Sequence, residues 1–216
     1  MPASKVRIVI QASEIQAIKA SWYLVTETET KPGISLGAFG MILVLVSIGA
    51  FFAALAAAYY FVLAERTEGE PGHFSNWFWL STALIVLSSG CLQRARSTLL
   101  FARFDSYRRD LWVTTAVGLA FLVTQVLGCL DLNAQGVFVA GNAKGSMYYV
   151  FTGVHGFHLL GGIGALVWLV RKARALRDGE EQPLRRHRAA ARHVASYWHF
   201  MGAVWIGLFV FLLIWR

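Results

Sequence analysis

Five long stretches of the chain contain no Asp, Glu, Lys or Arg, and they constrain the fold more than any other feature. They run over approximately residues 36–63, 76–92, 111–130, 147–170 and 194–215. A helix needs about 20 apolar residues to cross the hydrocarbon core of a bilayer, and each stretch is near or above that length. Lipid offers no hydrogen-bond partners to the backbone, so each stretch must be helical. We therefore predict an all-α membrane protein with five transmembrane helices.

The composition excludes the common soluble classes. Only 15% of the residues are charged and 56% are hydrophobic, whereas a soluble globular domain usually carries about 25% charged residues. Two cysteines cannot build a disulfide framework. A transporter or channel is disfavoured because all twelve acidic residues are expected in the tail and loops, and no inverted repeat is visible.

The basic residues predict the orientation of the chain in the membrane. Seventeen of the 20 Lys and Arg residues fall in the first 35 residues or directly after the second and fourth stretches. By the positive-inside rule these segments are cytoplasmic, which places the N-terminus in the cytoplasm and the C-terminus outside. We expect a cytoplasmic N-terminal tail over residues 1–35 and a five-helix bundle over residues 36–216. The net charge of +8 is then a topology signal, and no nucleic-acid partner is expected.

Three histidines lie inside the predicted spans. His155 and His158 are three residues apart and share one helix face. Imidazole is a common metal ligand, so a metal or haem site is one hypothesis. However, the helical rise places His199 about 10 Å or more in depth from either of the other two, too far for a shared metal. We therefore expect polar anchors that bond to neighbouring helices or headgroups, and no metal site.

Other residues in the spans indicate helix packing. Gln125 is alone in the third span and can donate and accept hydrogen bonds across helices. We expect it to pair with one of the histidines or with a hydroxyl such as that of Thr152. The small pair Gly161 and Ala165 predicts a close helix approach.

A basic segment over residues 171–193 carries eight cations. It is expected to be a loop on the inner surface, lying on anionic headgroups or on an acidic partner face. His187 and His193 belong to this segment, and we expect both to be solvated.

Two sequence stretches resemble a known family. Residues 145–162 read GSMYYVFTGVHGFHLLGG, and residues 197–205 read YWHFMGAVW. Together they resemble the signature of subunit III of cytochrome c oxidase and of related haem–copper terminal oxidases. The resemblance covers residues 36–216 and is most specific in the last two helices.

The resemblance implies an accessory, non-catalytic subunit of a respiratory oxidase in a prokaryotic plasma membrane. Such a subunit has no redox centre of its own; haem and copper belong to the partner subunit I. It packs on subunit I, binds phospholipid between its helices, and supports proton uptake and stable turnover. The residues for which we expect a role in lipid binding or helix packing are His155, His158, His199, Trp198, Gln125 and Arg192.

The chain also departs from the family pattern. The family usually has seven helices, and the first two are expected to be absent here, as in some bacterial quinol oxidases and nitric-oxide-reductase-associated relatives. Family acids align with Ile48, Arg192 and Gly202, which argues against a carboxylate-dependent role at these positions. Arg192 is instead expected to meet a lipid phosphate. Two alternatives stay open: a nitric-oxide-reductase-associated relative, and a small membrane haem-binding oxidoreductase that uses the buried histidines.

Overall fold

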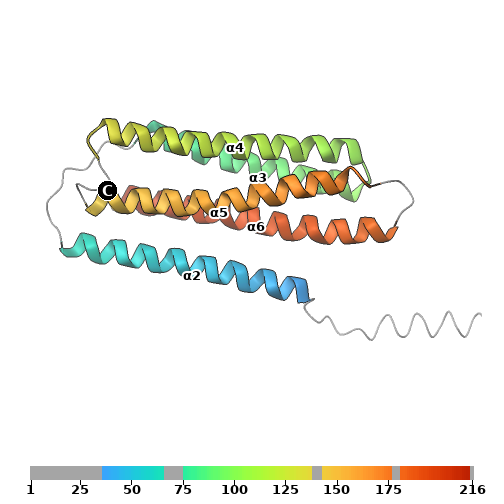
Figure 1. Ribbon diagram of the computed structural model, residues 1–216, viewed down its shortest axis with the longest axis horizontal. Coiled ribbons are helices and arrows are strands. Elements are labelled where there is room, and N and C mark those ends of the chain that lie inside the picture. The colour runs from blue at the N-terminus through green and yellow to red at the C-terminus, as the bar shows by residue number, and fades with distance from the viewer. Residues whose placement is uncertain (1–35, 66–74, 138–142, 177–180, 215–216) are drawn as a thin grey trace, which may run out of the picture. The chain divides into compact units, whose positions relative to one another are not determined.

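The computed structural model describes residues 36–65, 75–137, 143–176 and 181–214. These residues form five long α-helices and no β-strand (Figure 1), which confirms the all-α prediction. The predicted N-terminal tail, residues 1–35, lies outside the described residues. The helices are α2 (Leu36–Glu65), α3 (Asn76–Leu100), α4 (Phe104–Ala134), α5 (Ala143–Ala173) and α6 (Glu181–Ile214).

Four of these helices, α2, α4, α5 and α6, are long and apolar enough to cross a membrane. The remaining helix, α3, is less apolar because hydroxyl groups occupy its inner face. Ser81 and Ser88 are fully buried there. Their hydroxyls donate to backbone carbonyls, Ser81 to that of Phe78 and Ser88 to that of Thr114 on α4. The opposite face of α3 exposes Trp79 and Leu87, as expected for a surface that meets lipid.

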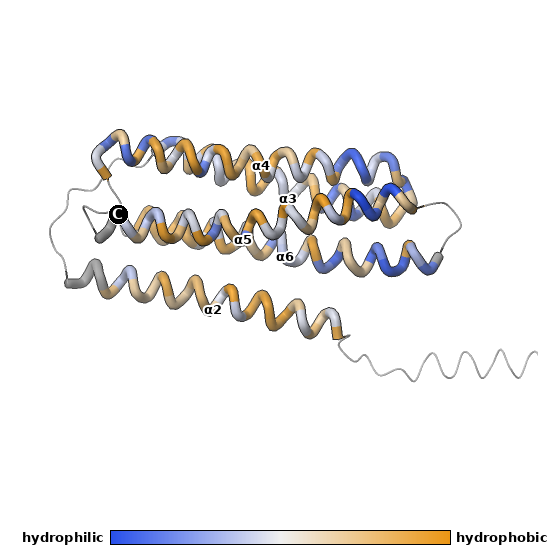
Figure 2. The backbone as a smooth tube through the Cα atoms, viewed as in Figure 1, coloured by the Kyte–Doolittle hydropathy of each residue, from blue (hydrophilic) through white to orange (hydrophobic). Residues whose placement is uncertain are grey.

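The helices extend beyond the charge-free stretches. At 1.5 Å per residue, α4 and α6 are roughly 46 and 51 Å long, more than the hydrocarbon core requires. The basic segment that we expected to be a loop is largely helical, because residues 181–193 form the first part of α6. Alanine and arginine, which dominate this part of the sequence, both favour helix. Figure 2 shows the hydrophilic residues of the bundle concentrated at one end.

Helices α3 to α6 form a four-helix bundle. Each packs against two others: α3 against α4 and α6, and α5 against α4 and α6. The α3–α4 connection is short, and its Ala102 has a left-handed backbone conformation with φ of 53°. The core between the helices is largely aromatic. The ring of Phe121 lies edge-on to that of Trp205, with centroids 5.4 Å apart, and Phe78 lies edge-on to Tyr148 at 5.0 Å.

The described residues from Gly40 onward belong to one compact unit. Within this unit, α2 contacts α5 and α6 chiefly through aromatic side chains. Phe52 lies 5.6 Å from the ring of His158, and Tyr59 lies 5.6 Å from the ring of Phe211, measured between centroids. Phe52 and Tyr59 are seven residues apart, so they lie on the same helix face two turns apart. Most of the remaining α2 surface is apolar and exposed.

Candidate functional site

His155 lies at the centre of the aromatic core. It has no solvent-exposed surface. The ring centroids of Trp205, Phe121 and Phe52 are 5.3, 5.8 and 6.1 Å from its own. Neither ring nitrogen has a hydrogen-bond partner among the described residues, and the same holds for the buried hydroxyl of Thr152 one turn earlier on α5. Buried polar groups usually have partners, so this part of the core has unused hydrogen-bonding capacity.

His158 occupies a different environment on the side of α5 that faces α2. Its Nδ1 lies 2.8 Å from the carbonyl oxygen of Val154. A carbonyl can only accept, so Nδ1 carries the proton, and Nε2 of the neutral ring is left as an acceptor. The rings of Phe51, Phe52 and Phe157 surround the imidazole. His158 can therefore accept a hydrogen bond at the α2–α5 contact.

Trp198 is fully buried and joins three helices. Its indole atoms lie 2.6 and 2.9 Å from the position that a Cβ would take at Gly118 on α4. They lie 3.2 and 3.3 Å from the corresponding position at Gly162 on α5. The close approach that we expected at Gly161 and Ala165 is therefore made by Gly162, because Gly161 has only the Tyr197 hydroxyl oxygen nearby, at 3.9 Å.

Gln125 is buried on α4 and pairs with a hydroxyl group of a neighbouring helix. The side-chain Nε2 donates to the hydroxyl oxygen of Ser81 on α3, at 2.8 Å. The expectation of a hydroxyl partner is confirmed. The hydroxyl belongs to Ser81 on α3 and not to Thr152 on α5, because this face of α4 turns toward α3. The Oε1 atom of Gln125 has no partner among the described residues.

The remaining candidates lie on α6. His199 is half-buried, and Arg192, two turns earlier, is exposed. Within the described part of the chain, no group of three or more His, Cys, Asp and Glu side chains is arranged to hold a metal ion.

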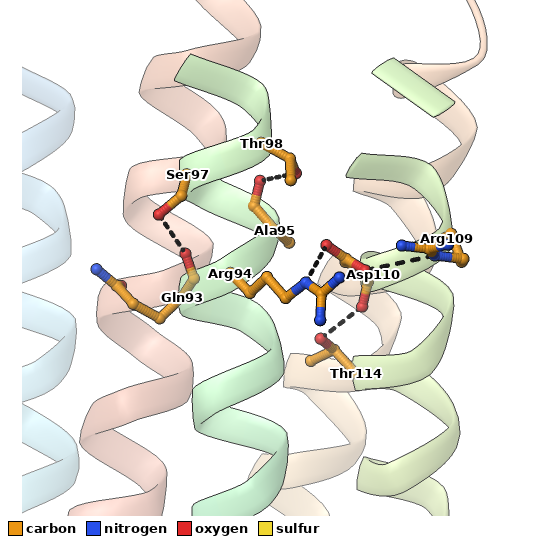
Figure 3. Close-up of polar contacts among 8 residues, drawn as sticks. All are labelled: Gln93, Arg94, Ala95, Ser97, Thr98, Arg109, Asp110 and Thr114. Carbon is orange, nitrogen blue, oxygen red and sulfur yellow. Dashed lines mark hydrogen bonds and ion pairs between the residues drawn. The ribbon is translucent and has the colours of Figure 1, made fainter. Parts of the chain in front are cut away.

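A buried carboxylate at the charged end of the bundle was missed in the sequence. Asp110 on α4 is only 5% exposed. One of its oxygens lies 3.4 Å from Nε of Arg94 on α3, and the other lies 3.7 Å from Nε of Arg109 (Figure 3). The expectation that all acids lie in the tail and loops was therefore wrong. Helical spacing could have found this residue, because Tyr107, Asp110 and Thr114 fall three and four residues apart on the buried stripe of α4.

His187 was also misplaced by the sequence argument, which expected it to be solvated. It is buried, and its Nε2 lies 2.9 Å from the hydroxyl oxygen of Tyr107 on α4. This pair links the charged first part of α6 to the start of α4. The expectation failed because residues 181–193 are not a loop but the first part of α6, from which the His187 side chain reaches Tyr107.

Comparison with known proteins identifies the family. The family model for cytochrome c oxidase subunit III matches residues 75–216, which include helices α3 to α6. A probable cytochrome c oxidase subunit 3 of Nocardia farcinica (strain IFM 10152) is 32% identical over 174 residues, covering 79% of this chain and 83% of that protein. The protein of the same description from Mycobacterium tuberculosis (strain ATCC 25618 / H37Rv) is 29% identical over the same coverage. Cytochrome c oxidase subunit 3 of Thermostichus vulcanus is 28% identical, covering 81% of this chain and 85% of that protein. With the aromatic four-helix bundle and the matched signature around His155 and Trp198, these similarities show that the chain belongs to the cytochrome c oxidase subunit III family.

Proposed function

We propose that this chain is an accessory, non-catalytic subunit of a respiratory haem–copper oxidase in a prokaryotic plasma membrane. It packs on subunit I, which carries the haem and copper, and it supports proton uptake and stable turnover. The observation that carries the proposal is the family match over the whole α3–α6 bundle. Membership in the family makes the chain part of an oxidase complex.

Lipid binding is part of the same proposal. The outer surfaces of the helices expose many large apolar side chains, among them Phe61, Phe157 and Val126. An exposed apolar surface of this kind suits acyl chains or apolar partner helices. His158, with its acceptor nitrogen at the α2–α5 contact, offers a polar anchor at the edge of such a surface.

The second candidate function, a haem-binding oxidoreductase, does not fit the residues around His155. A haem needs one of the imidazole nitrogens as an axial ligand. His155 is fully buried, with the rings of Phe121 and Trp205 packed against it. A porphyrin at either nitrogen would displace these rings and the core that they fill.

The proposal is tested by purifying the tagged full-length chain from its native membrane in mild detergent. The reduced-minus-oxidised spectrum and the identity of the bound proteins are then recorded. We expect haem bands that accompany a large copper-binding subunit and disappear when this chain is isolated from it. A haem band that stays with the isolated chain would contradict the proposal.

The variant His158→Leu provides a second test, in which the amount of haem is measured per complex and does not depend on the purification yield. In His158→Leu the side chain keeps a similar size, but the polar imidazole and its hydrogen bond to Val154 are lost. We expect an unchanged amount of haem per complex, together with weaker retention of this subunit or of bound lipid. A stoichiometric loss of haem in this variant would instead point to a ligand role for His158.

A further inference from the structure

Buried polar groups from all four helices of the α3–α6 bundle meet in one layer of its core. On α3, the hydroxyl of Ser81 accepts a hydrogen bond from Gln125 of α4, at 2.8 Å. The neighbouring hydroxyl of Thr82 accepts one from the indole of Trp205 on α6, at 3.0 Å. Helix α5 contributes His155, whose ring centroid lies 5.3 Å from that of Trp205. Polar groups are costly inside a membrane protein unless they are paired, so each polar atom of this layer needs a partner.

Four atoms of this layer have no hydrogen-bond partner among the described residues. They are Oε1 of Gln125, Oγ1 of Thr152 and both ring nitrogens of His155. Each of these three residues is at most 5% exposed. A neutral imidazole has one N–H donor and one acceptor nitrogen, and a hydroxyl can donate as well as accept. Because buried polar side chains nearly always have partners, these atoms indicate a ligand that offers both donors and acceptors.

Helices α4 and α5 run antiparallel, which fixes the relative level of these side chains. The position that a Cβ would take at Gly118 of α4 lies 3.8 Å from Cγ1 of Ile163 on α5. Farther along, the hydroxyl of Tyr149 on α5 donates to the carbonyl oxygen of Cys129 on α4, at 3.3 Å. Residue numbers therefore rise along α4 as they fall along the neighbouring part of α5.

The rings of Phe121 and His155 mark one level of this helix pair, because their centroids lie 5.8 Å apart. Gln125 follows Phe121 by four residues on α4, and Thr152 precedes His155 by three residues on α5. Each is thus the next residue on the same helix face, toward the same end of the bundle. The side chains of Gln125 and Thr152 therefore begin about one helical turn, roughly 5 Å, from the level of the imidazole.

We propose that the core of the α3–α6 bundle binds at least one water molecule, held by His155, Thr152 and Gln125. Water has two donors and two acceptors, so it can donate to the amide oxygen and also bond to the hydroxyl and to an imidazole nitrogen. A buried water typically makes about three hydrogen bonds, and these three side chains supply that number. A metal ion would leave the donors of this set unpaired. The inference goes beyond the proposed function and requires only the folded bundle.

Bound water gives the buried histidine of the family signature a structural role. Gln125 already joins α4 to α3 through Ser81, and the water extends this polar contact to His155 and Thr152 on α5. In a bilayer, hydrogen bonds between helices contribute to their association, because lipid is as apolar as the helix surfaces. His155 then acts as a water ligand that joins helices, and it needs no metal or haem.

Radiolytic footprinting of the full-length chain, purified with its partners in mild detergent, tests for this water directly. X-rays convert bound water into hydroxyl radicals, which oxidise the side chains in contact with it, and mass spectrometry locates the oxidised residue. His155 has no solvent-exposed surface, so bulk water does not reach it. We expect oxidation of His155 in the unmodified protein. A His155 that stays unoxidised would overturn the proposal and would indicate a direct bond to a neighbouring group.

Thr152→Val removes one ligand of the water and keeps the size and branching of the side chain. Thr124→Val is the matched control, because Thr124 is 6% exposed and its hydroxyl donates to the Phe121 carbonyl of its own helix, at 2.7 Å. We expect oxidation of His155 to fall roughly twofold or more in Thr152→Val, since the water loses one of about three hydrogen bonds. It should stay unchanged in Thr124→Val and in Thr152→Ser, which keeps the hydroxyl. Equal oxidation in the two valine variants would overturn the proposal.

Thermal unfolding in detergent provides an independent test through the sign of the change. If the Thr152 hydroxyl were unpaired in the folded protein, Thr152→Val would remove a buried unsatisfied group and raise the unfolding midpoint. With water bound, the same substitution breaks a hydrogen bond, so we expect a midpoint below that of Thr124→Val. A higher midpoint for Thr152→Val would contradict bound water. The haem content and partners of the complex are not involved in either test, so a failure here leaves the proposed function intact.

Discussion

At the scale of single residues, the family signature around Trp198 has a packing explanation. The indole fills the space that side chains at Gly118 and Gly162 would otherwise occupy. In a bilayer, helices associate through close packing because apolar surface is not driven out of lipid. A large ring against two glycines gives such packing to three helices at once. Gly118 and Gly162 are therefore as much a part of the α4–α5–α6 contact as the tryptophan.

Replacing Gly118 by alanine should destabilise the bundle. The new Cβ would lie 2.6 Å from a ring atom of a fully buried tryptophan, and overpacking of this kind costs about 1–3 kcal/mol. Gly164→Ala is the matched control, since no atom lies within 4 Å of its added Cβ and alanine favours helix over glycine. Thermal unfolding in detergent measures both. Equal midpoints for the two variants would contradict the packing role given to Gly118.

At the scale of helices, α2 differs from the other four. Helices α3 to α6 pack against one another in a ring of contacts, whereas α2 reaches α5 and α6 mainly through aromatic side chains such as Phe52 and Tyr59. The small residue Gly49 adds a contact with the ring of Phe200. Because only a few side chains hold α2, separating it from the bundle should cost less free energy than separating any of the helices α3 to α6.

Phe52→Ala should loosen α2 from α5. Phe52 is 4% exposed, and truncating a buried phenylalanine costs about 3–5 kcal/mol. Spin labels at Val46 and Leu160, in a background without Cys91 and Cys129, report the separation of the two helices. We expect a broader distance distribution in Phe52→Ala.

The control for this experiment is Phe61→Ala, because Phe61 is 67% exposed and its ring lies against Tyr60 of the same helix. Its distance distribution should match that of the unmodified protein. An unchanged distribution in Phe52→Ala as well would mean that other contacts hold α2.

At the scale of the whole molecule, charge is distributed asymmetrically along the bundle. The starts of α4 and α6 and the end of α5 carry most of the described cations. Figure 2 shows hydrophilic residues gathered at one end of the bundle. Asp110 is buried among these cations and pairs with two of them, Arg94 and Arg109. This end of the molecule is therefore suited to the anionic cytoplasmic leaflet.

The same asymmetry predicts the topology of the chain. With the basic end in the cytoplasm, the C-terminus lies outside. Alkaline phosphatase fused to the C-terminus should be active, because it folds only outside the cytoplasm, and a green fluorescent protein fused there should be dark. The opposite pair of results would reverse the predicted orientation.

The sequence by itself determined the helices and the family. Charged side chains are expensive in hydrocarbon, so five stretches without them predicted five helices. The charges that flank these stretches hid how far α3, α4 and α6 extend. The signature around His155 and Trp198 was readable because it is contiguous in the chain.

Only the tertiary structure decided which side chains meet. A helix that is apolar on every side does not reveal which face turns toward a neighbour. For this reason the sequence could not show that Gln125 pairs with Ser81, or that Trp198 fills the space at Gly118. Nor could it place Arg96 of α3 beside Arg192 of α6. These residues are far apart in the chain, and the rotation of each packed helix about its own axis brings them together.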